Sequence, residues 1–193
     1  NAGGKTIAVI GQAFPYTPIA NPSRFIPDWS FGIRAGELQS LVDTVRETER
    51  PDAVILLSHN GMDVDLKLAR VVSGIDAILG GHTHDGVPVP VIVDNAAGRT
   101  IVTNAGSNGK FLGVLDLEFG TGGVSDFRYR LLPVFSNLLP ADAAMNSYIA
   151  NVREPWRDTL EEPLEVREVA VVRRDREGGV ADLDVHVVTR RLD

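Results

Sequence analysis

The sequence predicts an α/β fold built around a largely parallel sheet. Three short apolar runs, at residues 6–10, 53–57 and 75–79, each end at a glycine or a polar turn, as buried strands do. The segments between these runs carry helices. Two strand–helix–strand units in succession are typical of parallel strands joined by crossover helices.

Both predicted helices follow from apolar residues three and four positions apart. In residues 35–50 the apolar face consists of Leu38, Leu41, Val42 and Val45. In residues 63–73 it consists of Val64, Leu68, Val71 and Val72. Pro51 ends the first helix, because proline cannot continue the hydrogen-bond pattern.

Residues 12–34 have no periodicity and contain four prolines and five aromatic residues. We interpret them as a long structured loop, a type of segment that is commonly functional. Beyond residue 85 the spacing of apolar runs shortens, with glycine or asparagine turns between them, which predicts a mixed or antiparallel continuation. These runs lie at residues 89–95, 99–106, 110–120 and 124–134. Residues 141–160 have a helical pattern.

Composition excludes several classes of protein. The 193 residues suffice for one substantial domain, or for one domain and part of a second. A net charge of −7 argues against nucleic-acid binding. No apolar run approaches the roughly 20 residues that span a bilayer, and residues 1–11 do not have the pattern of a signal peptide. The chain has no cysteine, so disulfides, thiolate metal ligands and cysteine nucleophiles are excluded.

Three of the four histidines follow the ends of two predicted parallel strands. His59 follows the second strand, while His82 and His84 follow the third. The carboxyl ends of parallel strands meet at one edge of a sheet, where ligands commonly bind. In extended backbone residues i and i+2 point the same way, so we expect His82 and His84 to face one site.

Neutral imidazole is the commonest nitrogen ligand for transition metals, so this pattern predicts a metal site. Gly80 and Gly81 allow the backbone to turn sharply there. Three histidines and a water are compatible with a mononuclear zinc site, whereas a two-metal site needs bridging carboxylates as well. We expect Asn60 and Asp85 to orient the imidazoles by hydrogen bonds. We attribute Asp63 and Asp65 to capping and to the dipole of the helix that they open.

Two stretches, LLSHNGMDVDLKLA and GIDAILGGHTHD, resemble the SoxB thiosulfohydrolases of the 5′-nucleotidase (metallophosphoesterase) superfamily. The stretches GQAFPYTPIANPSRFIPDWSFGIR and VTNAGSNGKFLGVLDLEF are also similar, so that the resemblance covers about residues 5–165. Nucleotidases typically have Gly-His-x-Gln where this chain has Gly-His-Thr-His. The resemblance implies the C-terminal half of a metallophosphoesterase-type αββα sandwich, plus the start of a linker or second domain.

On this resemblance residues 1–135 are the C-terminal part of a metallophosphoesterase-like catalytic domain, and residues 136–165 are a helical linker. Residues 166–193 depart from the family and have an unusual excess of Val, Arg, Asp and Glu. We interpret them as the start of a truncated C-terminal domain or as an aberrant, unassigned tail. A reading-frame slip would produce such a tail, and genomic sequence across codons 160–193 would refute this hypothesis if the frame proved intact.

The resemblance implies two divalent metal ions, manganese or alternatively zinc. His59 and His82 would bind one ion and His84 the other. The family's remaining ligand motifs do not occur before residue 59, so we expect this chain to carry half of the site. No residue within it is then a certain catalytic residue, and we expect the isolated fragment to be inactive.

The implied reaction releases sulfate from a cysteine S-thiosulfonate on the SoxYZ carrier protein during periplasmic thiosulfate oxidation. We expect no nucleic-acid or membrane partner. Four residues of the long loop are candidates for a channel that admits the carrier arm, namely Tyr16, Arg24, Trp29 and Arg34. Two alternatives stay open, a 5′-nucleotidase-type phosphoesterase and an inactive metal-binding fragment.

Overall fold

The chain is described by a computed structural model that covers residues 3–162, 166–174 and 180–188. It forms two units, Asn1–Leu138 and Leu139–Asp193. The elements of the first unit are β1 (Ile7–Gln12), α1 (Thr17–Ala20), η1 (Ser23–Phe25), α2 (Ala35–Thr48), β2 (Ala53–Ser58), α3 (Met62–Val71), β3 (Ala77–Gly80), β4 (Val91–Asn95), β5 (Gly98–Asn104), β6 (Phe111–Gly120) and β7 (Gly123–Pro133).

The main sheet has the strand order β1-β2-β3-β5-β4. β1, β2, β3 and β5 run parallel, and β4 pairs antiparallel with β5 at the edge. The predicted α/β fold and its mixed continuation are therefore confirmed. Both expected helices form, although the second begins one residue earlier and ends two residues earlier than its sequence pattern suggests.

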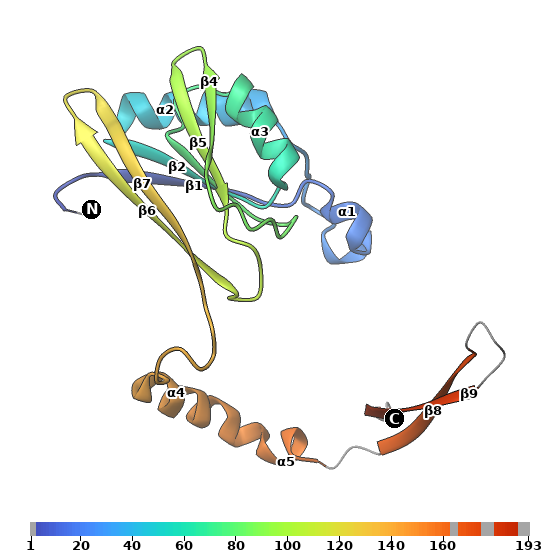
Figure 1. Ribbon diagram of the computed structural model, residues 1–193. Helices are drawn as coiled ribbons and strands as arrows, with labels where there is room; N and C mark the ends of the chain where they lie inside the picture. Colours follow the sequence, from blue (N-terminus) through green and yellow to red (C-terminus); the bar gives the residue numbers. More distant parts are fainter. Residues whose placement is uncertain (1–2, 163–165, 175–179, 189–193) are drawn as a thin grey trace. The chain divides into compact units, whose positions relative to one another are not determined.

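One face of the sheet carries the core. α2 and α3 cover this face (Figure 1). Val42, Leu56, Leu68 and Ile78 are almost completely buried there. Burial on this face accounts for alternate residues of the apolar runs, such as Leu56 and Ile78, while the residues between them, such as Ile55 and Ala77, point to the opposite face.

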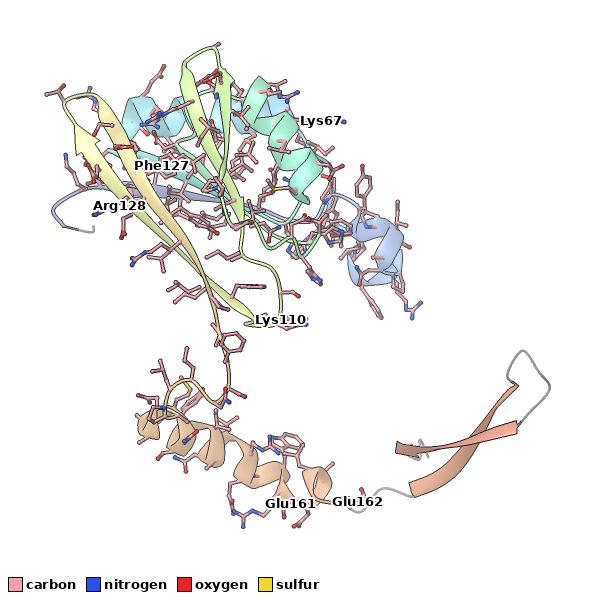
Figure 2. All side chains as sticks on the ribbon, viewed as in Figure 1. Lys67, Lys110, Phe127, Arg128, Glu161 and Glu162 are labelled. Atoms are coloured by element: carbon pink, nitrogen blue, oxygen red, sulfur yellow. The ribbon has the colours of Figure 1, made fainter. Side chains whose placement is uncertain are left out.

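The opposite face is only partly covered. The β6–β7 hairpin packs Leu115, Leu117 and Phe127 against Ile55 and Ala77, near the amino ends of the strands (Phe127 is labelled in Figure 2).

Toward the carboxyl ends of the strands the same face is open. Leu57 and Leu79 are 48% and 36% exposed there, and Val9, which lies in the middle of the edge strand β1 opposite Ile55, is 59% exposed. Leu57 and Leu79 are direct partners in the β2–β3 register, so they form a continuous apolar surface. A two-sheet sandwich buries such a surface under its second sheet.

The second unit contains α4 (Ala143–Arg153), η2 (Glu154–Trp156), α5 (Arg157–Leu160), β8 (Val166–Arg174) and β9 (Val180–Val188). The Asp142 carboxylate accepts a hydrogen bond from the Met145 N–H and caps α4, as an N-cap aspartate does. The helical pattern of residues 141–160 is thus confirmed. No helix in the described ranges is long and apolar enough to cross a membrane.

The sequence pattern assigns no secondary structure to residues 166–193. Their described backbone forms two antiparallel strands, β8 and β9. Residues 175–179 and 189–193 of that tail lie outside the described residues. The division into a catalytic part, a linker and an aberrant tail stays a prediction.

Candidate functional site

His59 and His82 meet at the carboxyl ends of β2 and β3. The His59 N–H donates to the carbonyl of Gln12 over 3.0 Å, which continues the β1–β2 ladder by one bond. The two imidazole centroids lie 5.3 Å apart, with ring planes at 64°. Both side chains are exposed. Adjacent strand ends therefore bring these two imidazoles together.

The backbone after β3 is not extended. His82 and His84 have positive φ angles of 75° and 59°, and the Thr83 N–H donates to the Gly81 carbonyl over 3.0 Å. This is a γ-turn centred on His82, which is a strained conformation for a non-glycine residue. The expectation that His82 and His84 point the same way in extended backbone is therefore wrong. Within the described residues no ring contact joins His84 to either of the other histidines.

Thr83 fastens this turn to α3. Its hydroxyl accepts a hydrogen bond from the Met62 N–H over 3.2 Å and donates one to the Asp85 carboxylate. Gly61 makes this approach possible, since a Cβ at that position would lie 2.9 Å from Thr83 Cγ2. Asp85 thus bonds to the turn itself rather than directly to an imidazole.

A buried polar network lies beneath His59. The Ser58 hydroxyl donates to the carboxylate of Asp65, which is fully buried in α3. The Asn60 amide donates to Ser58 Oγ and to Gln12 Oε1, each over 2.8 Å. Gln12 in turn donates to the Ile33 carbonyl over 2.5 Å. Asn60 therefore fixes the backbone around His59 and does not contact the ring by a hydrogen bond.

Asp63 and Asp65 lie in the first turn of α3, as the interaction with the helix dipole requires, but Asp65 is not a capping residue, so that part of our interpretation is wrong. The N-cap of α3 is Gly61, and it has no side-chain cap. Burial raises the pKa of the Asp65 carboxyl, and the charge of Asp63 adds to this, while hydrogen bonds from Ser58 and Asn60 oppose it. Among the described residues, Asp65 Oδ2 has no hydrogen-bond partner, and it lies 2.6 Å from where a Gly80 Cβ would stand. Gly80 is thus required for packing, whereas the expected sharp turn at Gly80 and Gly81 is not found, because neither has a positive φ angle and the left-handed positions are His82 and His84.

Phe14 also contacts the histidine pair. Its ring stacks on His82, with centroids 4.0 Å apart and planes at 27°, and meets His59 edge-on at 6.1 Å. Sequence reasoning missed Phe14, Gln12 and Ser58. The sequence signal that could have found them is their position at strand ends. Phe14 follows β1 as His59 follows β2, so the parallel pairing of these strands brings both residues to the same edge of the sheet.

The long loop contains α1 and η1 but no longer regular element. Two of its four candidate channel residues, Trp29 and Arg34, line one cavity of about 390 Å³, together with the carboxyl end of β1 and the start of α2. Tyr16 and Arg24 do not line that cavity. The Arg24 guanidinium lies over the Phe25 ring instead.

The histidine pair fits only part of a two-metal site. His59 and His82 offer two imidazoles at a distance that fits one wall of a metal site. Among the described residues, no group of three or more His, Asp or Glu side chains is arranged to hold an ion. These residues therefore do not complete a dinuclear site, and the assignment of three histidines to two ions stays a prediction.

Known proteins share this architecture. The sulfate thiohydrolase SoxB of Thermus thermophilus is 36% identical and superposes with a TM-score of 0.74 over 91% of this chain. A 5′-nucleotidase precursor from the same species is 26% identical, with a TM-score of 0.72 over 89%. The trifunctional nucleotide phosphoesterase YfkN of Bacillus subtilis is 43% identical over 86 residues, or 45% of this chain. No family profile matches the chain.

These similarities support a relationship of the chain to the 5′-nucleotidase superfamily. The fold matches the metallophosphoesterase-type domain of 5′-nucleotidases and SoxB. The chain spans 31% of the SoxB structure, 36% of the 5′-nucleotidase structure and 6% of YfkN. The chain therefore matches only part of the length of each of these relatives.

Proposed function

We propose that this chain supplies one wall of the active site of a metal-dependent hydrolase. The observation that carries the proposal is the meeting of His59 and His82 at two adjacent strand ends, on a turn that is strained at His82. Strained backbone persists where the surrounding structure enforces it, and it is concentrated at functional sites. When bound, a pair of divalent cations supplies hydroxide near neutral pH and stabilises developing negative charge.

The chain's own residues position this wall. Thr83 links the His82 turn to α3, while Asn60 and Ser58 link the His59 segment to Asp65 and β1. Such preorganisation matters because side chains that are already oriented need no rearrangement during the reaction. The open face beside Leu57 and Leu79 is where the remaining ligands of a two-sheet domain would approach.

We propose a thiosulfonate substrate, with sulfate released from a cysteine on the SoxYZ carrier and two manganese ions as cofactors. The 36% identity to SoxB exceeds the 26% identity to the 5′-nucleotidase, and this difference favours the sulfur substrate. A nucleotide phosphoester is the second candidate, which is favoured by the 43% identity to YfkN. Sulfonate and phosphate are both tetrahedral oxyanions, so the same active-site architecture can accommodate either group.

Turnover assays separate the two candidates. The full gene product is incubated with manganese and either AMP or thiosulfonate-loaded carrier. Sulfate release from the carrier without phosphate release from AMP is expected, and hydrolysis of AMP alone would overturn the thiosulfonate proposal. We propose a periplasmic location, to be tested by fractionation of the native host.

The half-site itself is tested by calorimetric titration of the 193-residue chain with Mn²⁺. Two imidazoles alone predict weak binding, and a tight two-ion stoichiometry would contradict the half-site.

A further inference from the structure

The His82 imidazole needs an external support. Its side chain is exposed and stands on the γ-turn, where φ is 75°. Within the described part of the chain, no hydrogen bond holds the ring of His82 or of His59. A side chain of this kind samples several rotamers unless packing selects one.

Phe14 supplies the missing contact. Its ring stacks on His82 at 4.0 Å and meets His59 edge-on at 6.1 Å, so one aromatic ring touches both imidazoles. The Tyr16 ring also contacts Phe14, edge-on at 5.7 Å. Stacked and edge-to-face pairs are the favoured arrangements of aromatic rings.

Phe14 is itself held in place. Its carbonyl accepts hydrogen bonds from the Thr17 N–H and the Thr17 hydroxyl, over 3.3 and 2.7 Å. At the other end of the same loop, the Ile33 carbonyl accepts a bond from Gln12. The loop is thereby tied to the His59 network at its end and packed on His82 at its start, so it is a built part of the site.

We propose that Phe14 is a positioning residue, which fixes the His82 ring against His59 and sets the direction in which the pair presents its nitrogens. The catalytic role of the Phe14–His82 contact rests on the proposed hydrolase function, whereas the existence of the contact does not. Loss of an aromatic pair shifts the equilibrium between stacked and unstacked rings by about two- to tenfold.

The test is nuclear magnetic resonance of the imidazole Hε1 protons in the full gene product, combined with the rate of diethylpyrocarbonate modification at each histidine. Phe14→Leu removes the ring at similar volume, and Phe14→Tyr restores it. Phe25→Leu is the matched control, because Phe25 lies in the same loop and contacts Arg24 rather than a histidine.

Phe14→Leu should abolish the upfield ring-current shift of His82 and raise its modification rate about two- to tenfold. His84 should be unaffected, and Phe14→Tyr should restore both values. Unchanged methyl resonances of the buried Leu68 and Ile78 show that the fold is intact.

An unaltered His82 in Phe14→Leu, an equal effect of Phe25→Leu, or no rescue by Phe14→Tyr would each overturn the proposal. These outcomes are read without any turnover assay, so they are independent of whether the hydrolase proposal fails.

Discussion

Replacement of Gly61 by alanine tests how the two histidine segments are joined. Gly61 has φ 101° and ψ 152°, a region that is essentially restricted to glycine. Forcing alanine into it costs about 1–3 kcal/mol. The new Cβ would also lie 2.9 Å from Thr83 Cγ2, and overpacking of this kind costs about 1–3 kcal/mol more. Gly61→Ala should therefore lower the free energy of unfolding by both amounts.

Urea unfolding with a double-mutant cycle separates the two contributions. Thr83→Ser removes Cγ2 and keeps the hydroxyl that Met62 and Asp85 use. In this background Gly61→Ala should lose the cost of the contact with Thr83 Cγ2 and keep the backbone cost, together with the weaker crowding against Asp63 Oδ1 at 3.3 Å. The control is Gly36→Ala in α2, where a Cβ meets nothing within 4 Å, and it should stabilise by about 0.5–1 kcal/mol. Equal costs of Gly61→Ala in both backgrounds would refute the contact with Thr83.

Further predictions concern charge and packing. Burial raises the pKa of Asp65 above its ordinary 3.8, so the folded state holds the proton more tightly and stability falls as pH rises from about 3.8 through the folded pKa. In Asp65→Asn this decrease in stability with pH should be absent from unfolding titrations. A pH profile identical to that of the wild type would contradict the prediction. At Asp52, hydrogen bonds from the Thr6 N–H and then from Lys5 lower the pKa of the carboxyl group. The wild-type protein therefore loses stability as pH falls below about 3.8, and Asp52→Asn should remove this pH-dependent contribution. Leu56→Ala should cost about 2–5 kcal/mol of unfolding free energy, whereas Val9→Ala on the open face should cost under about 0.5. Similar losses for the two would refute the assignment of the core face.

The fold was predictable because periodicity reports burial. Alternate residues of the apolar runs that became β2 and β3, such as Leu56 and Ile78, are buried on the helix-covered face, and the helical spacing of Leu38 and Val42 matches the face that α2 buries. Strand ends were displaced by one or two residues, since hydrogen-bond ladders extend into polar residues such as Gln12 and Ser58. The β8–β9 pairing was missed, because an alternation of valine with charged residues is irregular there.

The site was predictable only in part. The position of a residue at a strand end follows from the topology of the sheet, so the prediction that His59 and His82 lie close together was correct. The direction of His84 depended on the backbone conformation after Gly81, which local spacing does not report. Phe14 and the buried Asp65 were missed for a similar reason, because their roles arise from contacts between segments that are distant in sequence.

Manganese affinity of the full gene product tests the central claim most directly. If His59 and His82 bind the same ion, His59→Asn and His82→Asn should each weaken Mn²⁺ binding in calorimetric titration by about 10–100-fold or more. The double variant should weaken the binding of that ion little beyond either single variant, because one substitution already destroys the shared site. Unchanged affinity in either single variant, or additive losses in the double variant, would contradict a shared site.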